Sequence, residues 1–376
     1  MDTKKTPLYD EHIKMHGKMS DFAGWIMPLW YTAGQSQEHQ VTRKKCGLFD
    51  ICHMGEFKIT GSESQDFLSR LLTNNVDRVK DGQAVYSFML NEQGGVIDDC
   101  ILYKFDPENW MLVVNAGNID DDFNWIRKNA PSGVKLENAS NSTAKIDLQG
   151  PSAPKLMAKI AGKESINKLR FFRFRKGIKI NGMEIVVSRT GYTGEIGFEL
   201  YTEVENCITL WRLLLQEGEE FGILPCGLGA RDTLRTEAGL PLHGHELRQD
   251  RVAVGHPWEF AIDFESNFIG KEALEEKKNA GIDYYVVPFI IEGRRKAMPG
   301  WEALREDKVI GTVLSGVISP SLNNTPIGFA GLKSPLQQDE EIEFRKPESE
   351  KKISGRIAEI PFVSLTSRKK LKNFLV

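Results

Sequence analysis

Short strand-like segments joined in pairs by tight turns constrain the fold of this chain more than any other feature of its sequence. Residues 84–91 and 96–105 form one such pair around the turn NEQGG, and an Asn-Gly turn at 181–182 joins a second pair. Such turns join antiparallel strands, whereas parallel strands need long crossovers. Amphipathic helical patterns at 62–76 and 205–222 separate the strand groups. We therefore expect an α+β fold with mixed or antiparallel sheets and helices packed on one face.

The pattern changes near residue 275, and this change predicts a further domain. At about 150 residues per domain, 376 residues suffice for two or three domains. From residue 286 the chain consists of short strands and turns, which is typical of a small all-β barrel. We expect a body of two interleaved α+β lobes over 1–275, a C-terminal β-barrel domain over 285–365 and a basic tail over 366–376.

Composition and charge exclude several classes of function. The chain has 49 Lys and Arg against 52 Asp and Glu, a net charge of −3, which lacks the basic footprint of a nucleic-acid-binding protein. No window holds 18 consecutive apolar residues, and the N-terminus lacks the apolar segment of a secretory signal, so we expect no membrane span. Five cysteines without a CxxC pair predict free thiols in a reducing compartment, and we expect a cytoplasmic protein.

Polar residues and glycines interrupt two otherwise regular strands. Asp98 and Asp99 are adjacent in a strand, so their side chains point to opposite faces. Either both carboxylates are solvated after a hairpin, or one of the two is held in a cleft as an acid, a base or a partner for a cation. In SRTGYTGEIGFEL (188–200), three glycines recur at three-residue spacing, but strand rather than helix follows, which excludes a nucleotide fingerprint. Glu199 lies on the face opposite Phe198 and either is solvated or faces a site.

The segment PCGLGARDTLRTEAG (225–239) carries an unusual set of charges on one predicted helix. Arg231 and Arg235 are four residues apart, and this like-charge spacing is unfavourable unless an anion or carboxylates lie beside them. His243 and His245 have no third ligand at a suitable spacing, so no metal is expected. The aromatic segment 18–31 suits core packing or a platform for a flat ring. No Ser-His-Asp, P-loop or metal motif is present, and these patterns alone predict a cleft for a flat, anionic small molecule.

Taken together, these segments resemble the aminomethyltransferase (T-protein) family of the glycine cleavage system. The resemblance runs in the family's order to about residue 362. It rests on these motifs: DFAGWIMPLWY, GLFDICHMGEF, NEQGGVIDD, LQGP, SRTGYTGEIGFEL, GLGARDTLRTEAG with LPLHGHEL, FIGKEAL, and SG followed by SPSL. Any one of these motifs is weakly specific, whereas the ordered set is strongly specific.

The resemblance implies a reaction and its participants. An aminomethyl group carried on the lipoyl arm of the H-protein is passed to tetrahydrofolate, giving 5,10-methylenetetrahydrofolate, ammonia and the reduced lipoyl arm. The implied co-substrate is tetrahydrofolate, with no metal, and the implied partner is lipoylated H-protein. The family also implies three lobes around a central folate cavity, with the C-terminal β lobe closing one side.

The resemblance also assigns roles to individual residues. Asp99 matches the family's key carboxylate, which would lie by the folate nitrogens and stabilise the cationic iminium that forms as ammonia leaves. Asn115 and Glu199 match contacts to the pterin edge, where a carboxylate accepts from the adjacent ring N–H and amino group. Arg231 matches a cavity arginine that could pair with Asp99, a folate carboxylate or the lipoyl arm. The implied cavity lining is Met54, Tyr86 and Tyr192.

Some positions depart from the commoner family pattern, and none of them is one of the main carboxylates. Cys52 replaces a usual Ser, Ile196 a usual Asp and His243 a common Tyr, and the segment 248–264 also differs. One alternative is a folate-dependent demethylase of the same fold that acts on a small methylated donor. The other is a non-enzymatic folate-binding assembly factor, whose Lys-Gly-Cys-Tyr-x-Gly-Gln-Glu signature this chain lacks. Retention of GGVIDD and GYTGE favours the aminomethyltransferase.

Overall fold

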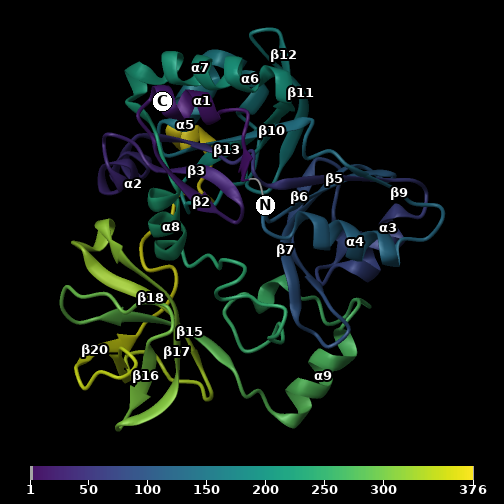
Figure 1. Ribbon diagram of the computed structural model, residues 1–376. Coiled ribbons are helices and arrows are strands. Elements are labelled where there is room, and N and C mark those ends of the chain that lie inside the picture. Colours follow the sequence, from purple (N-terminus) through teal and green to yellow (C-terminus); the bar gives the residue numbers. More distant parts are fainter. Residues whose placement is uncertain (1–2, 376) are drawn as a thin grey trace.

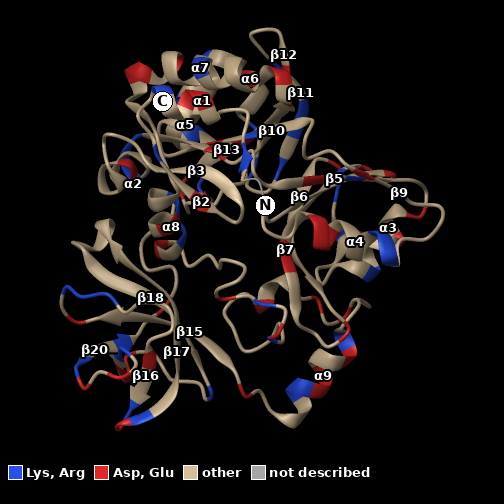
Figure 2. Ribbon diagram, viewed as in Figure 1, with Lys and Arg blue, Asp and Glu red and all other residues tan. Residues whose placement is uncertain are grey.

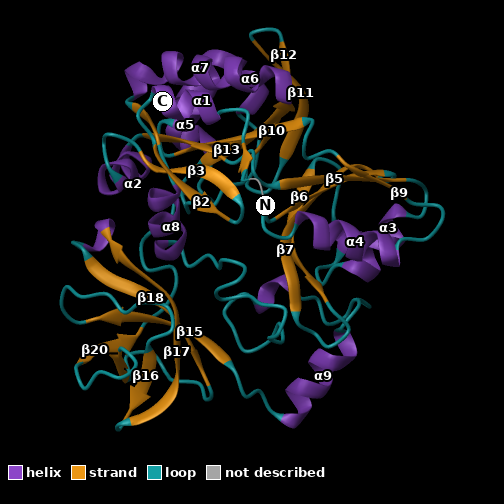
Figure 3. Ribbon diagram, viewed as in Figure 1, coloured by secondary structure: helices purple, strands orange, loops and turns teal. Residues whose placement is uncertain are grey.

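The computed structural model describes residues 3–375, and it arranges the chain as two α+β lobes and a β-barrel (Figures 1 and 3). The sequence-predicted α+β fold with a barrel-like C-terminal part is confirmed. Acidic and basic residues are interspersed over all three parts (Figure 2). No helix within residues 3–375 combines the length and apolar character needed to cross a membrane.

The first lobe is a five-stranded antiparallel sheet covered by two helices. Its strand order is β6 (Gln83–Leu90), β7 (Val96–Asp106), β8 (Asn109–Val114), β5 (Gly55–Thr60) and β9 (Lys135–Asn138). The covering helices are α3 (Ser64–Leu71) and α4 (Ile119–Asn129). The apolar side chains Phe57, Leu68 and Ile126 join sheet and helices in one buried cluster. This burial fixes which sheet face is left for the rest of the molecule.

The second lobe is a six-stranded mixed sheet. Its order is β11 (Phe174–Ile180), β12 (Met183–Ser188), β13 (Gly197–Glu203), β10 (Thr143–Gln149), β4 (Cys46–Asp50) and β14 (Ile223–Pro225). Only β14 pairs in parallel, with β4. The covering helices are α5 (Ala153–Ala161), α6 (Lys163–Ile166) and α7 (Cys207–Gly218). Leu156 and Trp211 of these helices pack on Ile146 and Leu200 of the sheet.

The N-terminal region adds a small sheet beside the second lobe. It consists of β1 (Lys4–Lys5), β3 (Trp25–Trp30) and β2 (Lys18–Phe22), with the helices α1 (Tyr9–Lys14) and α2 (Gln35–Lys44). The aromatic segment 18–31 therefore forms the β2–β3 hairpin. Only part of that hairpin is buried, and its turn, including Phe22 and Ala23, lines the central cavity described below.

The closed barrel follows α9 (Lys271–Ala280). Its strands, in order around the barrel, are β15 (Tyr285–Ile291), β18 (Thr325–Leu332), β17 (Lys308–Ser319), β16 (Glu302–Arg305), β19 (Glu341–Arg345) and β20 (Lys352–Ile357). After the barrel the chain returns to the second lobe, where Leu371 is buried in the lobe's apolar cluster. The segment predicted as a basic tail thus packs against the body through its apolar residues.

Helix α8 (Leu228–Glu237) lies between the second lobe, with its N-terminal elements α2 and β3, and the barrel, and it contacts both. The fully buried Glu237 accepts hydrogen bonds from Arg43 of α2 at 2.9 Å, the Ser319 hydroxyl at 2.5 Å and the Ser321 N–H at 3.0 Å. Burial opposes ionisation of Glu237, but the hydrogen bond to His39 and nearby positive charge lower its pKa to about 2. At neutral pH an ionised, buried carboxylate therefore bonds to α2 on one side and to Ser319 and Ser321 of the barrel on the other.

Residues 47–61 show where local alternation misleads. Their alternating pattern is typical of a single strand, but the chain forms β4 and β5, which belong to different lobes. Between the two strands, the Cys52 N–H donates to Asp50 Oδ1 at 2.8 Å, so the Asp50 side chain closes an Asx turn. Asp50 is itself held by His12 at 2.8 Å. Asp50 at this turn has its partner, His12, 38 residues away, which local periodicity does not encode.

Candidate functional site

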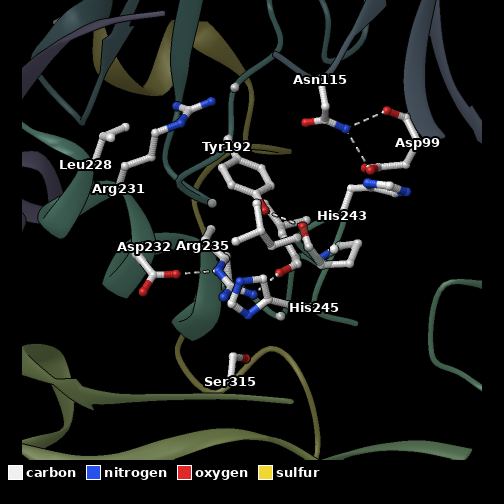
Figure 4. A pocket seen from close by; sticks show the side chains of 18 of the residues that line it. Asp99, Asn115, Tyr192, Leu228, Arg231, Asp232, Arg235, His243, His245 and Ser315 are labelled. Carbon is white, nitrogen blue, oxygen red and sulfur yellow. Dashed lines mark hydrogen bonds and ion pairs between the residues drawn. The ribbon is translucent and has the colours of Figure 1, made fainter. Parts of the chain in front are cut away.

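A cavity of about 1450 Å³ lies where the two lobes, α8 and the barrel meet. Its wall includes Asp99 of β7, Glu199 of β13, Arg231 of α8 and Val317 of the barrel strand β17. All seven residues that the sequence predicts for the site line this one cavity: Met54, Tyr86, Asp99, Asn115, Tyr192, Glu199 and Arg231. Figure 4 shows Asp99 and Asn115 on one side of the pocket and Arg231 on the other, with Tyr192 between them.

Asp99 is held at the cavity wall by two hydrogen bonds. The Tyr86 hydroxyl donates to Oδ2 at 2.9 Å. The Asn115 amide donates to Oδ1 at 2.9 Å (Figure 4). Burial, followed by the charge of Asp98, raises the pKa of Asp99 to about 6, although these hydrogen bonds oppose the shift. The carboxyl group therefore changes charge close to neutral pH, as suits a group that handles developing charge or protons.

Asp98 supports this arrangement from the opposite face of β7. It is fully buried and accepts from the Asn115 N–H and amide, both at 2.8 Å, and from the Asn118 amide at 2.9 Å. Because one amide of Asn115 bridges Asp98 and Asp99, Asn115 positions the predicted key carboxylate. Its carbonyl oxygen, on the side away from Asp99 in Figure 4, remains as an acceptor. The buried Asp122 lies beside Asp98, and burial followed by the Asp98 charge raises its pKa to about 11, so Asp122 is protonated.

Glu199 is fixed on the second lobe by three hydroxyl groups. Its Oε2 accepts from Thr190 at 2.6 Å, Tyr201 at 2.9 Å and Tyr103 at 3.1 Å. Burial opposes ionisation, but the charge of Lys145 and these hydrogen bonds lower the pKa of Glu199 below its ordinary value. Glu199 is therefore an ionised carboxylate whose orientation is set before any ligand binds.

Arg231 contacts a group that was not among the three partners considered from the sequence. Its guanidinium forms an ion pair with Asp147 at 2.8 Å and stacks over the Tyr192 ring at 4.8 Å. Burial raises the pKa of Asp147 to about 6, while Arg231 opposes that shift. Carboxylates also flank Arg235, which pairs with Asp232 at 2.8 Å and Glu246 at 2.9 Å. The like-charged arginines are thus explained by carboxylates of the protein.

Sequence reasoning missed Lys145 and Asp147, although a signal for them was present. In TAKIDLQG they alternate with Ile146 and Leu148, which lie in the apolar cluster of the second lobe. Strand pairing sets Lys145 opposite Tyr201 and Asp147 opposite Glu199. All four side chains therefore share one face of the sheet, the face that borders the cavity. Charged residues at every second position of a strand could have indicated this polar face.

The departures from the family pattern lie in different surroundings. Cys52 and Ile196 are buried and outside the cavity lining, and all five cysteine thiols are free. His243 does line the cavity, where its Nδ1 accepts from the Asn118 amide at 2.9 Å and its Nε2 donates to the Val96 carbonyl at 3.2 Å. Across residues 3–375, no three His, Cys, Asp or Glu side chains are grouped so as to hold a metal ion.

Comparisons with known proteins place this geometry in a family. The model of the GCVT N-terminal domain matches residues 8–266. An aminomethyltransferase of Halalkalibacterium halodurans is 42% identical over 334 residues, covering 89% of this chain and 91% of the relative. One from Caldanaerobacter subterraneus is 43% identical over 337 residues, covering 89% of both chains.

A solved structure agrees over almost the whole chain. The crystal structure of the glycine cleavage system aminomethyltransferase T from Bartonella henselae superposes with a TM-score of 0.89 at 32% identity. It covers 98% of this chain and 100% of that one, so the lobes and the barrel are all matched. With the matching family model and these relatives, the chain belongs to the aminomethyltransferase family.

Proposed function

We propose that this chain transfers the methylene of an aminomethyl group from the lipoyl arm of the glycine-cleavage H-protein to tetrahydrofolate. The products are 5,10-methylenetetrahydrofolate, ammonia and the dihydrolipoyl arm. Family membership supports the reaction type, and folate and H-protein are the co-substrate and partner that this reaction needs. Five buried free thiols suit a reducing compartment, so we expect the reaction to take place in the cytoplasm.

The observation that carries the proposal is the pair of separate carboxylates in one cavity. Asp99 has a pKa raised to about 6, while Glu199 has a lowered pKa and is held by three hydroxyl donors. A pterin needs an acceptor for its ring N–H and amino group, and the ionised Glu199 meets that need. The reacting nitrogens need a carboxylate where positive charge develops, and Asp99 meets that need.

The bonds balance without any further reactant. The methylene carbon loses its bonds to sulfur and to the amino nitrogen and gains bonds to N5 and N10 of the folate. The two protons released by these nitrogens go to the lipoyl sulfur and to the departing ammonia. We assign to Asp99 the stabilisation of the positive charge that develops as ammonia leaves, with Tyr86 and Asn115 holding its carboxylate in place.

The donor is tested by offering the purified chain two kinds of substrate with tetrahydrofolate. We expect rapid ammonia release with aminomethyl-loaded H-protein and negligible folate methylation or methylenation with small N-, O- or S-methylated donors. The control is H-protein without its lipoyl group, which should give no turnover. Activity with methylated donors and none with loaded H-protein would instead establish the demethylase.

A further inference from the structure

Lys145 is a buried charge in the cavity wall that the reaction described above does not use. Its side chain is 1% exposed and belongs to β10, beside Glu199 of β13. The Nζ atom lies 3.6 Å from Glu199 Oε1, 3.6 Å from Met54 Sδ and 5.3 Å from the centre of the Tyr201 ring. Lys145, Glu199 and Met54 all line the cavity.

These contacts leave the hydrogen-bonding capacity of Lys145 largely unused. An N–H···O hydrogen bond spans about 2.7–3.2 Å, so the 3.6 Å separation from Glu199 is an ion pair without a direct hydrogen bond. A thioether sulfur is only a weak acceptor. Within residues 3–375, no closer oxygen acceptor meets this ammonium group, although a buried charge ordinarily has hydrogen-bond partners.

The neighbouring carboxyl groups do not take up this capacity. The three hydroxyl donors of Glu199 all bind Oε2, which leaves Oε1 beside Lys145 Nζ as the available acceptor. Burial raises the pKa of nearby Glu56 to about 8, and its Oε1 has no hydrogen-bond partner among the described residues. Glu56 is therefore neutral at pH 7 and does not compete as an anion for Lys145.

We propose that Lys145 and Glu199 together read the amide edge of the pterin ring, with Lys145 Nζ donating to the C4 carbonyl oxygen while Glu199 Oε1 accepts from the adjacent N3–H. This inference rests on the proposed function, because it names the part of the folate that binds here. The pterin edge presents an acceptor next to a donor, and the cavity presents a donor next to an acceptor. Lys145 is then a specificity-determining residue that favours a 4-oxo ring.

The competing role for Lys145 is that of a counterion, which keeps Glu199 ionised without touching the ligand. Both roles lower folate affinity when Lys145 is replaced, so affinity alone does not separate them. The vibration of the ligand carbonyl does, because a hydrogen bond from an ammonium group weakens the C=O bond and lowers its stretching frequency.

The first measurement is the affinity for 5-methyltetrahydrofolate, a stable analogue of the acceptor, with the full chain. We expect Lys145→Met to bind about 10- to 100-fold more weakly, as the loss of a hydrogen bond to a charged group requires. The matched control is Lys104→Met, which removes another buried lysine. Lys104 lies on β7 outside the cavity lining, bonded to Gln65 at 2.8 Å, and its replacement should leave affinity unchanged.

The second measurement is the infrared difference spectrum of the ligand carrying carbon-13 at C4. In the wild-type complex we expect the carbonyl band at a lower frequency than for the free ligand in an aprotic solvent. In the Lys145→Met complex we expect the band at a higher frequency than in the wild-type complex. A wild-type band at the aprotic position overturns the inference even if the variant does not fold. If Lys145→Met binds more weakly but its carbonyl band stays at the wild-type frequency, Lys145 is a counterion, and the inference is likewise overturned. If the wild type does not bind the folate at all, the proposed function itself fails.

Discussion

Replacing Asp99 with asparagine is expected to lower the rate of ammonia release by about 10²- to 10³-fold, with folding and most of the folate affinity retained. The amide keeps the size of the carboxyl group and an oxygen for the Tyr86 hydroxyl, which donates to Asp99 at 2.9 Å. It cannot carry the negative charge that stabilises the departure of ammonia. Steady-state rates with loaded H-protein, together with the equilibrium affinity for tetrahydrofolate, measure the two effects separately.

The pH dependence of the wild-type rate independently tests the role of Asp99. Asp99 has a pKa of about 6, raised above its ordinary value by burial and by Asp98. The ionised form predominates above pH 6, so the rate should fall as pH is lowered through 6, and Asp99→Asn should lack this limb. Asp120→Asn, the same change at an exposed position of α4, is the control and should keep both rate and profile. A near-normal rate in Asp99→Asn would refute the role assigned to Asp99.

Replacing Glu199 with glutamine is expected to weaken tetrahydrofolate binding by about 2–4 kcal/mol, which is roughly 30-fold or more. The change removes the negative charge beside Lys145. It also introduces an amide N–H₂, a donor that must face either the N–H donor of the pterin ring or the three hydroxyl donors that bind Oε2. The effect should appear mainly in the KM for folate, with a smaller change in kcat at saturating folate, because Glu199 is assigned to binding.

Glu203→Gln is the matched control for this second variant. Glu203 belongs to the same strand, β13, but it is exposed and outside the cavity lining. Its replacement should change neither kcat nor KM. Unchanged folate affinity in Glu199→Gln would show that the pterin edge binds elsewhere in the cavity, and it would remove the basis for the role of Lys145 as well.

The hairpins, the C-terminal barrel and seven of the residues that line the cavity could be predicted from the sequence. Glycine turns between short strand patterns predict hairpins such as β6–β7 and β11–β12. The change in sequence pattern near residue 275, to short strands and turns, predicts the strands of the barrel. The seven site residues came from motif resemblance, and the fold brings them to one cavity. The roles assigned to them stay predictions until variants are measured.

What the sequence could not supply was the pairing of elements far apart in the chain. Residues 47–61 divide between two sheets at a turn held by Asp50, whose partner His12 lies 38 residues away. The Asp147 partner of Arg231 lies 84 residues away, and only the register of β10 against β13 reveals that it shares a sheet face with Glu199. Periodicity shows which way a side chain points, but it does not show which strand lies next to it.

The central claim is that this chain moves a methylene group from H-protein to folate. The most direct measurement is a single turnover with H-protein carrying a carbon-13-labelled aminomethyl group, followed by nuclear magnetic resonance with and without tetrahydrofolate. We expect ammonia and labelled 5,10-methylenetetrahydrofolate to appear in equal amounts and at the same rate, both dependent on folate. Label that stays on the H-protein in the presence of folate, or that is released as free formaldehyde with ammonia at a rate independent of folate, would contradict the account.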